Sequence, residues 1–254
     1  MSRKKQAADD FTIEETILIE RLRSFRVPGM VEEYKRQLQD PNADLLPFEE
    51  RFTRIVNAEW FKRYNKKLND KLKKAKLRYL DADLDESIYD PARSLDTETI
   101  ELLADCKWIE TGKNLLITGM SSSGKTYLSN ALCVTALRQL KDVQYIRASR
   151  LMQELDRARN NGNYLEYIEG KMALDLLVID DFGLMEFDLD KCRDLFEVID
   201  GRNGRKSTII VSQFPVKKWY DLFADITYAE ACLSRITDTK HSYRLEMNGR
   251  SMRG

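Results

Sequence analysis

Apolar residues follow two different patterns along the chain. In the first part they recur every three or four positions, which predicts amphipathic helices. Residues 11–39 predict two short helices with a break at the Val-Pro-Gly sequence of residues 27–29. From Pro47 the same period continues through Tyr79 and predicts one long helix or two nearly continuous ones. The acidic stretch 81–96 contains a proline and lacks a period, so we expect a linker there.

From Leu115 onward, short apolar runs alternate with helical segments, which is typical of a parallel α/β sheet. The expected strands are Leu115–Thr118, Val143–Arg147, Leu176–Asp180 and Thr208–Ser212. The expected helices between them cover about residues 126–140, 149–159 and 189–201. We therefore expect a small all-helical domain over residues 1–80, a linker over 81–110 and an α/β domain with a central parallel sheet over 111–254.

Charge is distributed very unevenly. The chain has 42 Lys and Arg residues and 42 Asp and Glu residues, so its formal net charge is zero. Between Phe61 and Leu80, however, there are nine cations and one acid, Asp70. The cations of this basic segment are Lys62, Arg63, Lys66, Lys67, Lys71, Lys73, Lys74, Lys76 and Arg78. The lysines lie on the face of the predicted helix away from its apolar stripe, so we expect them to be solvent-exposed.

Cysteine usage and hydropathy limit the class of protein. The cysteines are widely spaced without a Cys-x-x-Cys pair, and the single histidine, His241, cannot complete a zinc site of the usual spacing. A reducing, cytoplasmic location is therefore expected. No apolar run approaches the ~18 residues that a membrane span needs, so we expect no membrane partner.

The strongest chemical signal is the glycine-rich sequence Gly119-Met120-Ser121-Ser122-Ser123-Gly124-Lys125-Thr126. It has the form G-x-x-x-x-G-K-[ST], follows a predicted strand and opens a predicted helix, which is the setting of a Walker A loop. Backbone N–H groups and the helix N-terminus then converge on nucleotide phosphates. Lys125 would neutralise the β and γ phosphates of ATP, and the Thr126 hydroxyl would ligate Mg²⁺. A serine-rich turn before a helix is the structural alternative.

A second acidic element ends the strand predicted at Leu176–Asp180. Four apolar residues run directly into Asp180 and Asp181, as in a Walker B element, whose carboxylate faces the magnesium ion held by the loop. We assign Asp180 to the magnesium side and Asp181 to polarising the attacking water. The latter role more often belongs to the longer Glu, so slow hydrolysis is expected. The alternative is that one acid caps the strand end.

Two further polar residues complete the candidate ATPase site. Gln213 follows the strand Thr208–Ser212 and could orient the lytic water if that strand adjoins the other two. Arg235 stands among apolar neighbours, which suits an arginine finger delivered to the ATP of the next subunit. A surface salt bridge is the alternative role for this arginine.

These elements, in this order, resemble the AAA+ P-loop ATPases, and specifically the branch that holds the DnaC-like helicase loaders and the IstB-like transposition helpers. The N-terminal half distinguishes these two groups, because several of its sequences look like the N-terminal region of the IstB-like family. Those sequences lie at residues 22–30, 48–51, 58–60, 75–79 and 106–109.

This resemblance implies an ATP-dependent DNA-binding regulator that self-assembles on double-stranded DNA and helps a transposase select and attack target sites. It implies ATP and Mg²⁺ as cofactors, with Lys125 and Thr126 contacting the nucleotide, Asp180 on the magnesium side, Gln213 as sensor and Arg235 as finger. Hydrolysis would be slow and stimulated by DNA or a partner. Relatives commonly have Asn at the sensor position. The residues after Arg235 are too few for the helical lid of a full AAA+ module, so we expect that lid to be lacking.

Other functions remain open at this point. The basic segment is consistent with binding of the DNA backbone, although a charged helix is usually a solvated face. A replicative helicase loader of the DnaC type would share the ATPase core and bind a helicase instead of a transposase. A small-molecule kinase could use the same loop, but the sequence lacks an arginine-rich substrate lid near its C-terminus.

Overall fold

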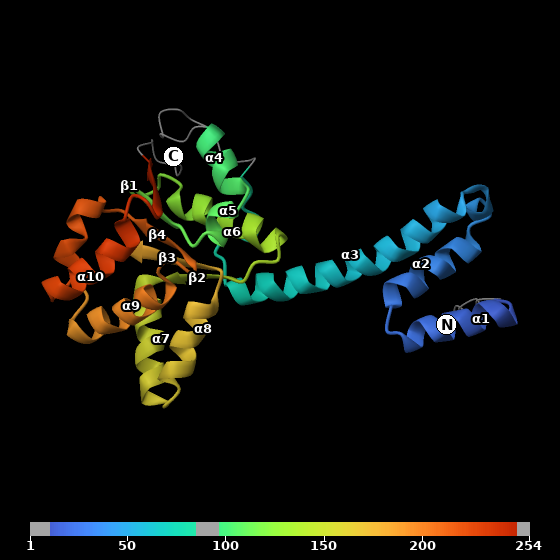
Figure 1. Ribbon diagram of the computed structural model, residues 1–254, viewed down its shortest axis with the longest axis horizontal. Coiled ribbons are helices and arrows are strands. Elements are labelled where there is room, and N and C mark those ends of the chain that lie inside the picture. The colour runs from blue at the N-terminus through green and yellow to red at the C-terminus, as the bar shows by residue number, and fades with distance from the viewer. Residues whose placement is uncertain (1–10, 85–96, 248–254) are drawn as a thin grey trace, which may run out of the picture. The chain divides into compact units, whose positions relative to one another are not determined.

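The computed structural model describes residues 11–84 and 97–247 (Figure 1). The chain divides into two compact units, which we call the helical unit, Met1–Lys67, and the sheet unit, Leu68–Gly254. The division falls inside one long helix, so the domain boundary expected at residue 80 stays a prediction. The predicted linker lies largely outside the described residues.

The helical unit contains the two short helices that the sequence predicts and the first part of the long one. These are α1 (Ile13–Ser24), α2 (Pro28–Gln39) and α3 (Phe48–Ala75), with a 3-10 turn η1 (Ala43–Leu45) before α3. α1 begins with a capping box in which Thr12 and Glu15 exchange hydrogen bonds. The helix break falls where the Val-Pro-Gly sequence predicts it.

Helices α2 and α3 approach each other closely at Gly29. A Cβ atom at this position would lie 2.7 Å from the backbone oxygen of Ala58, so the contact requires a residue without a side chain. The Gly29 N–H donates to Glu59 Oε2 at 2.7 Å, and Arg63 donates to the other oxygen of the same carboxylate at 2.6 Å. A polar contact thus fixes the helix pair at a glycine.

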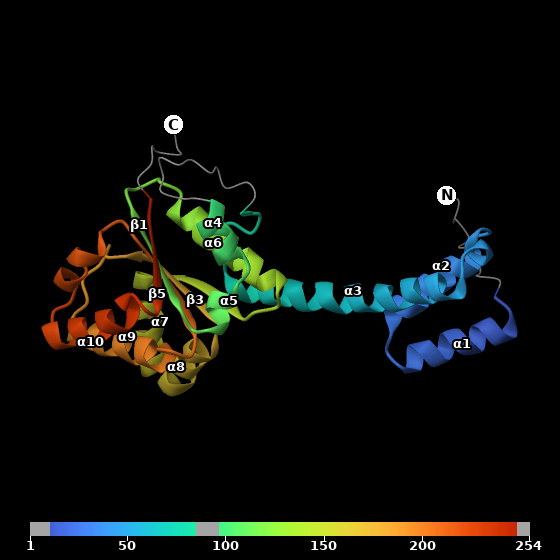
Figure 2. The same ribbon diagram turned by 45° about the horizontal axis from the view of Figure 1, so that its top comes forward.

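The sheet unit is built on five parallel strands in the order β2-β3-β4-β1-β5. They are β1 (Asn114–Gly119), β2 (Val143–Arg147), β3 (Leu176–Phe182), β4 (Ser207–Ser212) and β5 (Ser242–Met247). Figure 2 shows the strands running side by side between layers of helices. The parallel α/β sheet is confirmed, and β4 does adjoin both β1 and β3, as the assignment of Gln213 requires.

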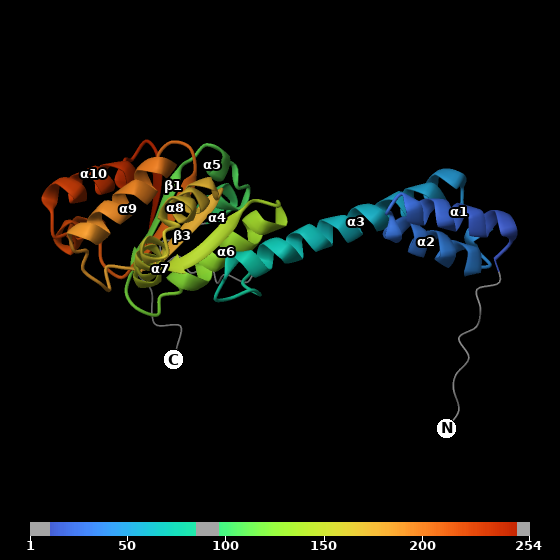
Figure 3. The ribbon, with the colours of Figure 1, turned by 90° about the horizontal axis from the view of Figure 1, so that it is seen from below.

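Helices cover both faces of this sheet (Figure 3). One face carries the end of α3 with α4 (Thr97–Ala104), α5 (Lys107–Glu110) and α6 (Lys125–Arg138). The other face carries α7 (Ala148–Asn160), α8 (Tyr164–Ala173), α9 (Leu189–Arg202) and α10 (Ile226–Thr237), with turns η3 (Val216–Lys218) and η4 (Tyr220–Leu222). Two apolar cores therefore sandwich the sheet.

Within the described residues, α10 is followed by the strand β5. β5, α8 and α10 are elements that the sequence patterns did not predict. None of the helices described here is both long enough and apolar enough to cross a membrane.

Candidate nucleotide site

The carboxyl ends of β1, β3 and β4 form the edge at which the predicted ATPase residues meet. β1 leads into the glycine-rich loop, β3 ends at the paired aspartates, and Thr118 of β1 pairs with Ser212 of β4. Because all strands are parallel, their carboxyl ends share one side of the sheet, where α/β proteins bind nucleotides. The predicted loop, acids and sensor position are thereby brought together.

The glycines of the loop are required by its backbone. Gly119 has φ of 142°, and a Cβ atom there would lie 2.2 Å from the carbonyl oxygen of Met247 at the end of β5. Gly124 has φ of 91° and is the N-cap of α6. Both conformations favour glycine over other residues. The loop therefore closes tightly against β5 and turns directly into the N-terminus of α6, where helix N–H groups lack partners within the helix.

Lys125 lies inside the loop. Its side-chain Nζ donates to the carbonyl oxygens of Gly119 and Met120 at 2.7 and 2.6 Å. Burial lowers the pKa of this ammonium, and the nearby Asp180 and Asp181 oppose that shift. A buried ammonium beside helix N–H groups is the arrangement that binds nucleotide phosphates.

Thr126 and Asp180 form a direct contact between the loop and β3. Thr126 Oγ1 donates to Asp180 Oδ2 at 2.8 Å, and the buried Tyr145 donates its hydroxyl to the same oxygen at 2.7 Å. The Asp181 N–H donates to Asp180 Oδ1 at 2.7 Å. Asp180 is only 2% exposed, so three hydrogen bonds hold an otherwise costly buried carboxylate.

The donor set at this point fits Mg²⁺. A hydroxyl oxygen and a carboxylate oxygen from Thr126 and Asp180 already lie within 2.8 Å of each other. Magnesium prefers oxygen ligands and usually keeps waters and substrate phosphates in its remaining positions, so it does not need a third protein carboxylate. Among the described residues there is no cluster of three metal-binding side chains, which is compatible with this kind of site.

Asp181 lies at an irregularity of β3. The register between β3 and β4 shifts between Ile179 and Phe182, and Asp181 has φ of 56°. Asp is among the few residues besides Gly that enter this left-handed region readily. The irregularity redirects the strand at the position predicted to polarise water.

The charge of Asp181 is balanced by a cation that the sequence analysis missed. Arg147, at the end of β2, places its Nε 3.3 Å from Asp181 Oδ2. Burial and the charge of Asp180 raise the pKa of Asp181, while Arg147, Arg78 and Lys125 lower it. Arg147 also pairs with Asp180 in the strand register. The net effect is a raised pKa for this partly buried base candidate, and Arg147 limits the rise.

Gln213 follows β4 and is exposed at the same edge. Ser212 before it is buried and donates its hydroxyl to the Phe182 carbonyl oxygen at 2.5 Å. This bond joins the ends of β3 and β4 and positions the backbone from which Gln213 projects. Its sensor role stays a prediction.

Arg235 lies far from the glycine-rich loop of its own chain. Its carbonyl oxygen accepts a hydrogen bond from Asn114 at the opposite, amino-terminal end of β1. The side chain pairs with Asp200 at 2.6 Å and lies over the ring of Phe196. A six-residue strand spans ~20 Å, more than an arginine can reach. Any action of Arg235 on ATP must therefore be on another subunit.

The basic segment extends over both units. In the helical unit, Lys62 pairs with Glu32 and Arg63 pairs with Glu59, while Lys66 and Lys67 are exposed. The exposed cations of the basic segment that lie in the sheet unit are Lys73, Lys74, Lys76 and Arg78. Lys71 is the exception, because it is half-buried and pairs with Asp142 at 2.5 Å. The expectation of exposed lysines is thus met except at Lys71, where a contact to the loop before β2 covers the side chain.

Arg78 lies closer to the candidate site than its sequence position indicates. The N–H groups of Arg78 and Tyr79 both donate to Asn130 Oδ1, at 2.9 and 3.1 Å. The amide of Asn130, which is fully buried in α6, donates in turn to the Thr126 carbonyl oxygen at 2.8 Å. The end of the basic segment is thereby attached to the helix that carries Lys125 and Thr126.

Tyr145, Arg147 and Asn130 are the site residues that sequence reasoning missed. Arg147 had a usable signal, because it ends a predicted strand of the same sheet. Tyr145 and Asn130 had none, since their partners depend on how β2 and α6 pack in three dimensions.

The fold and this site together define a P-loop ATP-binding protein with a central parallel sheet. The chain belongs to the IstB-like ATP binding protein family, whose model matches residues 20–254. An insertion sequence ATP-binding protein of Sinorhizobium fredii is 35% identical over 232 residues, which cover 91% of this chain and 92% of the relative. The ATP-binding protein of insertion sequence IS1162 from Pseudomonas fluorescens is 35% identical over 197 residues, which cover 78% of this chain and 85% of the relative.

Solved structures support the fold assignment. The DnaC helicase loader matches with a TM-score of 0.53 and 21% identity, over 67% of this chain and 98% of the loader. DnaA from Aquifex aeolicus, bound to AMPPCP, matches with a TM-score of 0.54 and 20% identity, over 65% of this chain and 49% of DnaA. At this identity the similarity concerns the fold alone.

Proposed function

We propose that this protein is an ATP-dependent switch that assembles on double-stranded DNA and assists the transposase of its insertion sequence. The observation that carries the proposal is the direct contact from the glycine-rich loop through Thr126 to Asp180, at a sheet edge that also holds Asp181. A family of insertion sequence ATP-binding proteins supplies the transposition context.

Each residue at this carboxyl-terminal edge of the sheet has its own role in ATP hydrolysis. Lys125 would neutralise the β and γ phosphates, and Thr126 and Asp180 would hold Mg²⁺, which would neutralise further charge on the phosphate oxygens. Asp181 polarises the attacking water when its carboxylate is ionised, with Gln213 orienting that water. The ion pair of Asp181 with Arg147 competes with this role, so basal hydrolysis is slow.

Assembly of subunits would add Arg235 to the ATP site of a neighbouring subunit. Arg235 lies at the amino-terminal end of the sheet in its own chain, on α10, and would reach the γ phosphate of a neighbouring subunit after leaving Asp200. Its present pair with Asp200 is partly exposed, and such pairs cost little to break. ATP would thereby stabilise an oligomer in which each subunit completes the next.

The basic segment supplies the DNA contact. Its exposed lysines suit phosphate groups, which bind through charge neutralisation and counterion release without base reading. The hydrogen bonds from the N–H groups of Arg78 and Tyr79 to Asn130 connect this segment to α6, the helix that carries Lys125 and Thr126. DNA binding and nucleotide state would therefore influence each other.

The test compares DNA binding by the wild-type protein and two variants with ATP and Mg²⁺. We expect Lys125→Ala to lose ATP-dependent assembly and with it tight DNA binding. We expect Lys71→Ala/Lys73→Ala/Lys74→Ala to retain ATP binding but to show weaker, less salt-dependent DNA binding. Wild-type affinity and salt slope in both variants would exclude the mechanism. Recovery of a replicative helicase, rather than a transposase, as the bound partner would favour the loader alternative.

A further inference from the structure

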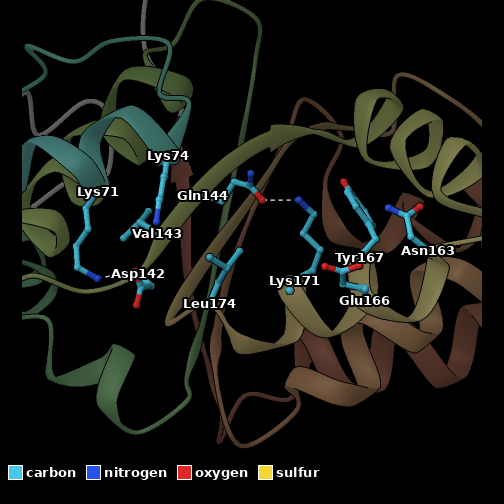
Figure 4. Close-up of a pocket in the computed structure, with 11 residues that line it drawn as sticks. Lys71, Lys74, Asp142, Val143, Gln144, Asn163, Glu166, Tyr167, Lys171 and Leu174 are labelled. Atoms are coloured by element: carbon cyan, nitrogen blue, oxygen red, sulfur yellow. Dashed lines mark hydrogen bonds and ion pairs between the residues drawn. The ribbon is translucent and has the colours of Figure 1, made fainter. Parts of the chain in front are cut away.

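A pocket of about 370 Å³ lies in the sheet unit, beside the beginning of the edge strand β2 (Figure 4). It is at the amino-terminal edge of the sheet, opposite to the glycine-rich loop. Lys71 and Lys74, from the last turns of α3, line one side. Tyr167 and Lys171, from α8, line the other. The pocket is therefore separate from the candidate ATPase site.

Lys171 is the unusual residue of this pocket. It is only 6% exposed, its Nζ donates to Gln144 Oε1 at 2.5 Å, and it lies over the ring of Tyr167. No carboxylate of the described residues comes within 4.0 Å of its ammonium group. A buried charge without a counter-ion is costly, and an anion in the pocket would remove that cost.

The other cations of the pocket continue the basic segment. Lys71 pairs with Asp142, whereas the exposed Lys74 makes no ion pair with a described residue. With Glu166 as the remaining acid, the lining carries three lysines and two carboxylates. A lysine ammonium group binds phosphate as a point charge. Because the exposed lysines of α3 lead into the pocket, the occupant that this charge suits is a phosphate of a nucleic-acid backbone that follows those lysines, and an acidic peptide is the alternative that the test separates.

We propose that this lysine pocket binds one backbone phosphate of duplex DNA, with Lys74 and Lys171 supplying the two ammonium groups. The inference rests on the proposed DNA-binding function and adds a contact from α8, outside the basic segment. DNA that follows the exposed lysines of α3 would be anchored there to the sheet unit itself.

The variants Lys171→Met and Lys74→Met test the pocket. Methionine keeps an unbranched side chain while removing the charge, and Lys107→Met, at a lysine exposed elsewhere on the sheet unit, is the matched control. For each single variant we expect a smaller change in the same direction, and for the double variant Lys74→Met/Lys171→Met we expect the slope of log affinity against log salt to be shallower by about 0.9, the value for one phosphate. Extrapolated from 1 M salt, that slope change weakens binding about eightfold at 0.1 M salt. The control and the ATP affinity should not change.

A pH series gives a second readout for Lys171. Burial lowers the pKa of this residue to about 8, Glu154 opposes the shift, and Lys76 adds to it. A bound phosphate would favour the charged form, so wild-type affinity should fall between pH 7 and 9 more steeply than that of Lys171→Met. The charged and titratable groups that face Lys171 and stay in both proteins are Glu154 and Arg150 of α7, Glu166 and Tyr167 of α8, Asp142 before β2, and Lys71, Lys74 and Lys76.

The outcomes separate this inference from the proposed function. Duplex binding by the wild-type protein with unchanged slopes in both pocket variants overturns the pocket and leaves the proposed function standing. Loss of transposase binding with intact DNA binding also overturns it, because the pocket would then hold an acidic peptide. Absence of duplex binding by the wild-type protein overturns the proposed function itself. If Lys171→Met does not fold, the salt slope of Lys74→Met, at an exposed position, decides whether the pocket binds DNA.

Discussion

Phe52 in the helical unit is 50% exposed, whereas Phe182 in the sheet unit is completely buried. This difference is general. Within residues 11–67 the buried apolar side chains are Ile19, Val31 and Ala43, while the sheet unit encloses two extensive apolar cores. The helical unit therefore gains less from apolar burial than the sheet unit does, and its α2–α3 contact includes the polar pair of Gly29 with Glu59.

The two units differ in the kind of binding surface that they offer. Contiguous exposed apolar side chains are typical of surfaces that contact other macromolecules. In the helical unit they follow one another along α3, where Phe48 stacks on Phe52 and Trp60 stacks on Tyr64. The sheet unit instead fixes a few polar groups rigidly at one edge, as a phosphate site needs.

The largest effect is expected from a buried charge of the sheet unit. Replacing Lys125 by Ala removes the ammonium held between the carbonyl groups of Gly119 and Met120. We expect ATP hydrolysis to fall at least about 100-fold, because charge stabilisation at the phosphates is lost. Lys107→Ala is the control. Hydrolysis at the wild-type rate by Lys125→Ala would show that the carboxyl-terminal edge of the sheet is not the ATPase site.

Two phenylalanine substitutions, one in each unit, test whether apolar burial stabilises the sheet unit more than the helical unit. Phe182→Ala should lower the free energy of unfolding of the sheet unit by about 3–5 kcal/mol, since it opens a cavity against Phe187 and Trp219. Phe52→Ala should cost less than about 1 kcal/mol, because its ring is half in solvent. Urea unfolding followed by circular dichroism measures both. Equal costs would contradict the contrast between the units.

Arg147→Met should change the pH dependence of hydrolysis. Arg147 lowers the pKa of Asp181, so its removal raises that pKa and Asp181 loses its ionised, basic form at a higher pH. We expect the acid limb of the pH–rate profile to move to higher pH. Arg150→Met, which removes a cation of similar exposure from α7, should leave the limb in place. An unmoved limb in Arg147→Met would remove Asp181 from the role of base.

The smallest effect is expected from a single exposed cation of the basic segment. Lys73→Ala should leave stability and ATP affinity unchanged and make the salt dependence of duplex binding shallower by about one unit. Titration of a labelled duplex at several salt concentrations measures the slope. A slope equal to that of the wild-type protein would place Lys73 outside the DNA contact.

Much of the sheet unit could be predicted from the sequence for a simple reason. Strands β1, β3 and β4 are buried on both faces, so they read as continuous apolar runs. β5 lies at the edge of the sheet and alternates polar and apolar residues, and this weaker signal was missed. The loop that follows β1 and the acids that end β3 were predictable because their spacing reflects their chemistry.

The remaining parts of the site depend on packing that is not written in the local sequence. The pair of Arg147 with Asp181 needs the register of β2 against β3, and the pair of Lys71 with Asp142 joins residues far apart in the chain. The exposure of Phe48 and Phe52 could not be predicted either, because a helical apolar period does not show whether another element packs on that face of the helix.

The central claim is that ATP at the sheet edge controls assembly on DNA. The most direct test is the mass of complexes formed on a duplex of fixed length with ATP, with ADP and with no nucleotide, for the wild-type protein and Arg235→Ala. We predict multi-subunit complexes only for the wild-type protein with ATP, because Arg235 would complete the neighbouring site. Equal masses under all three nucleotide conditions, or normal assembly by Arg235→Ala, would contradict the account.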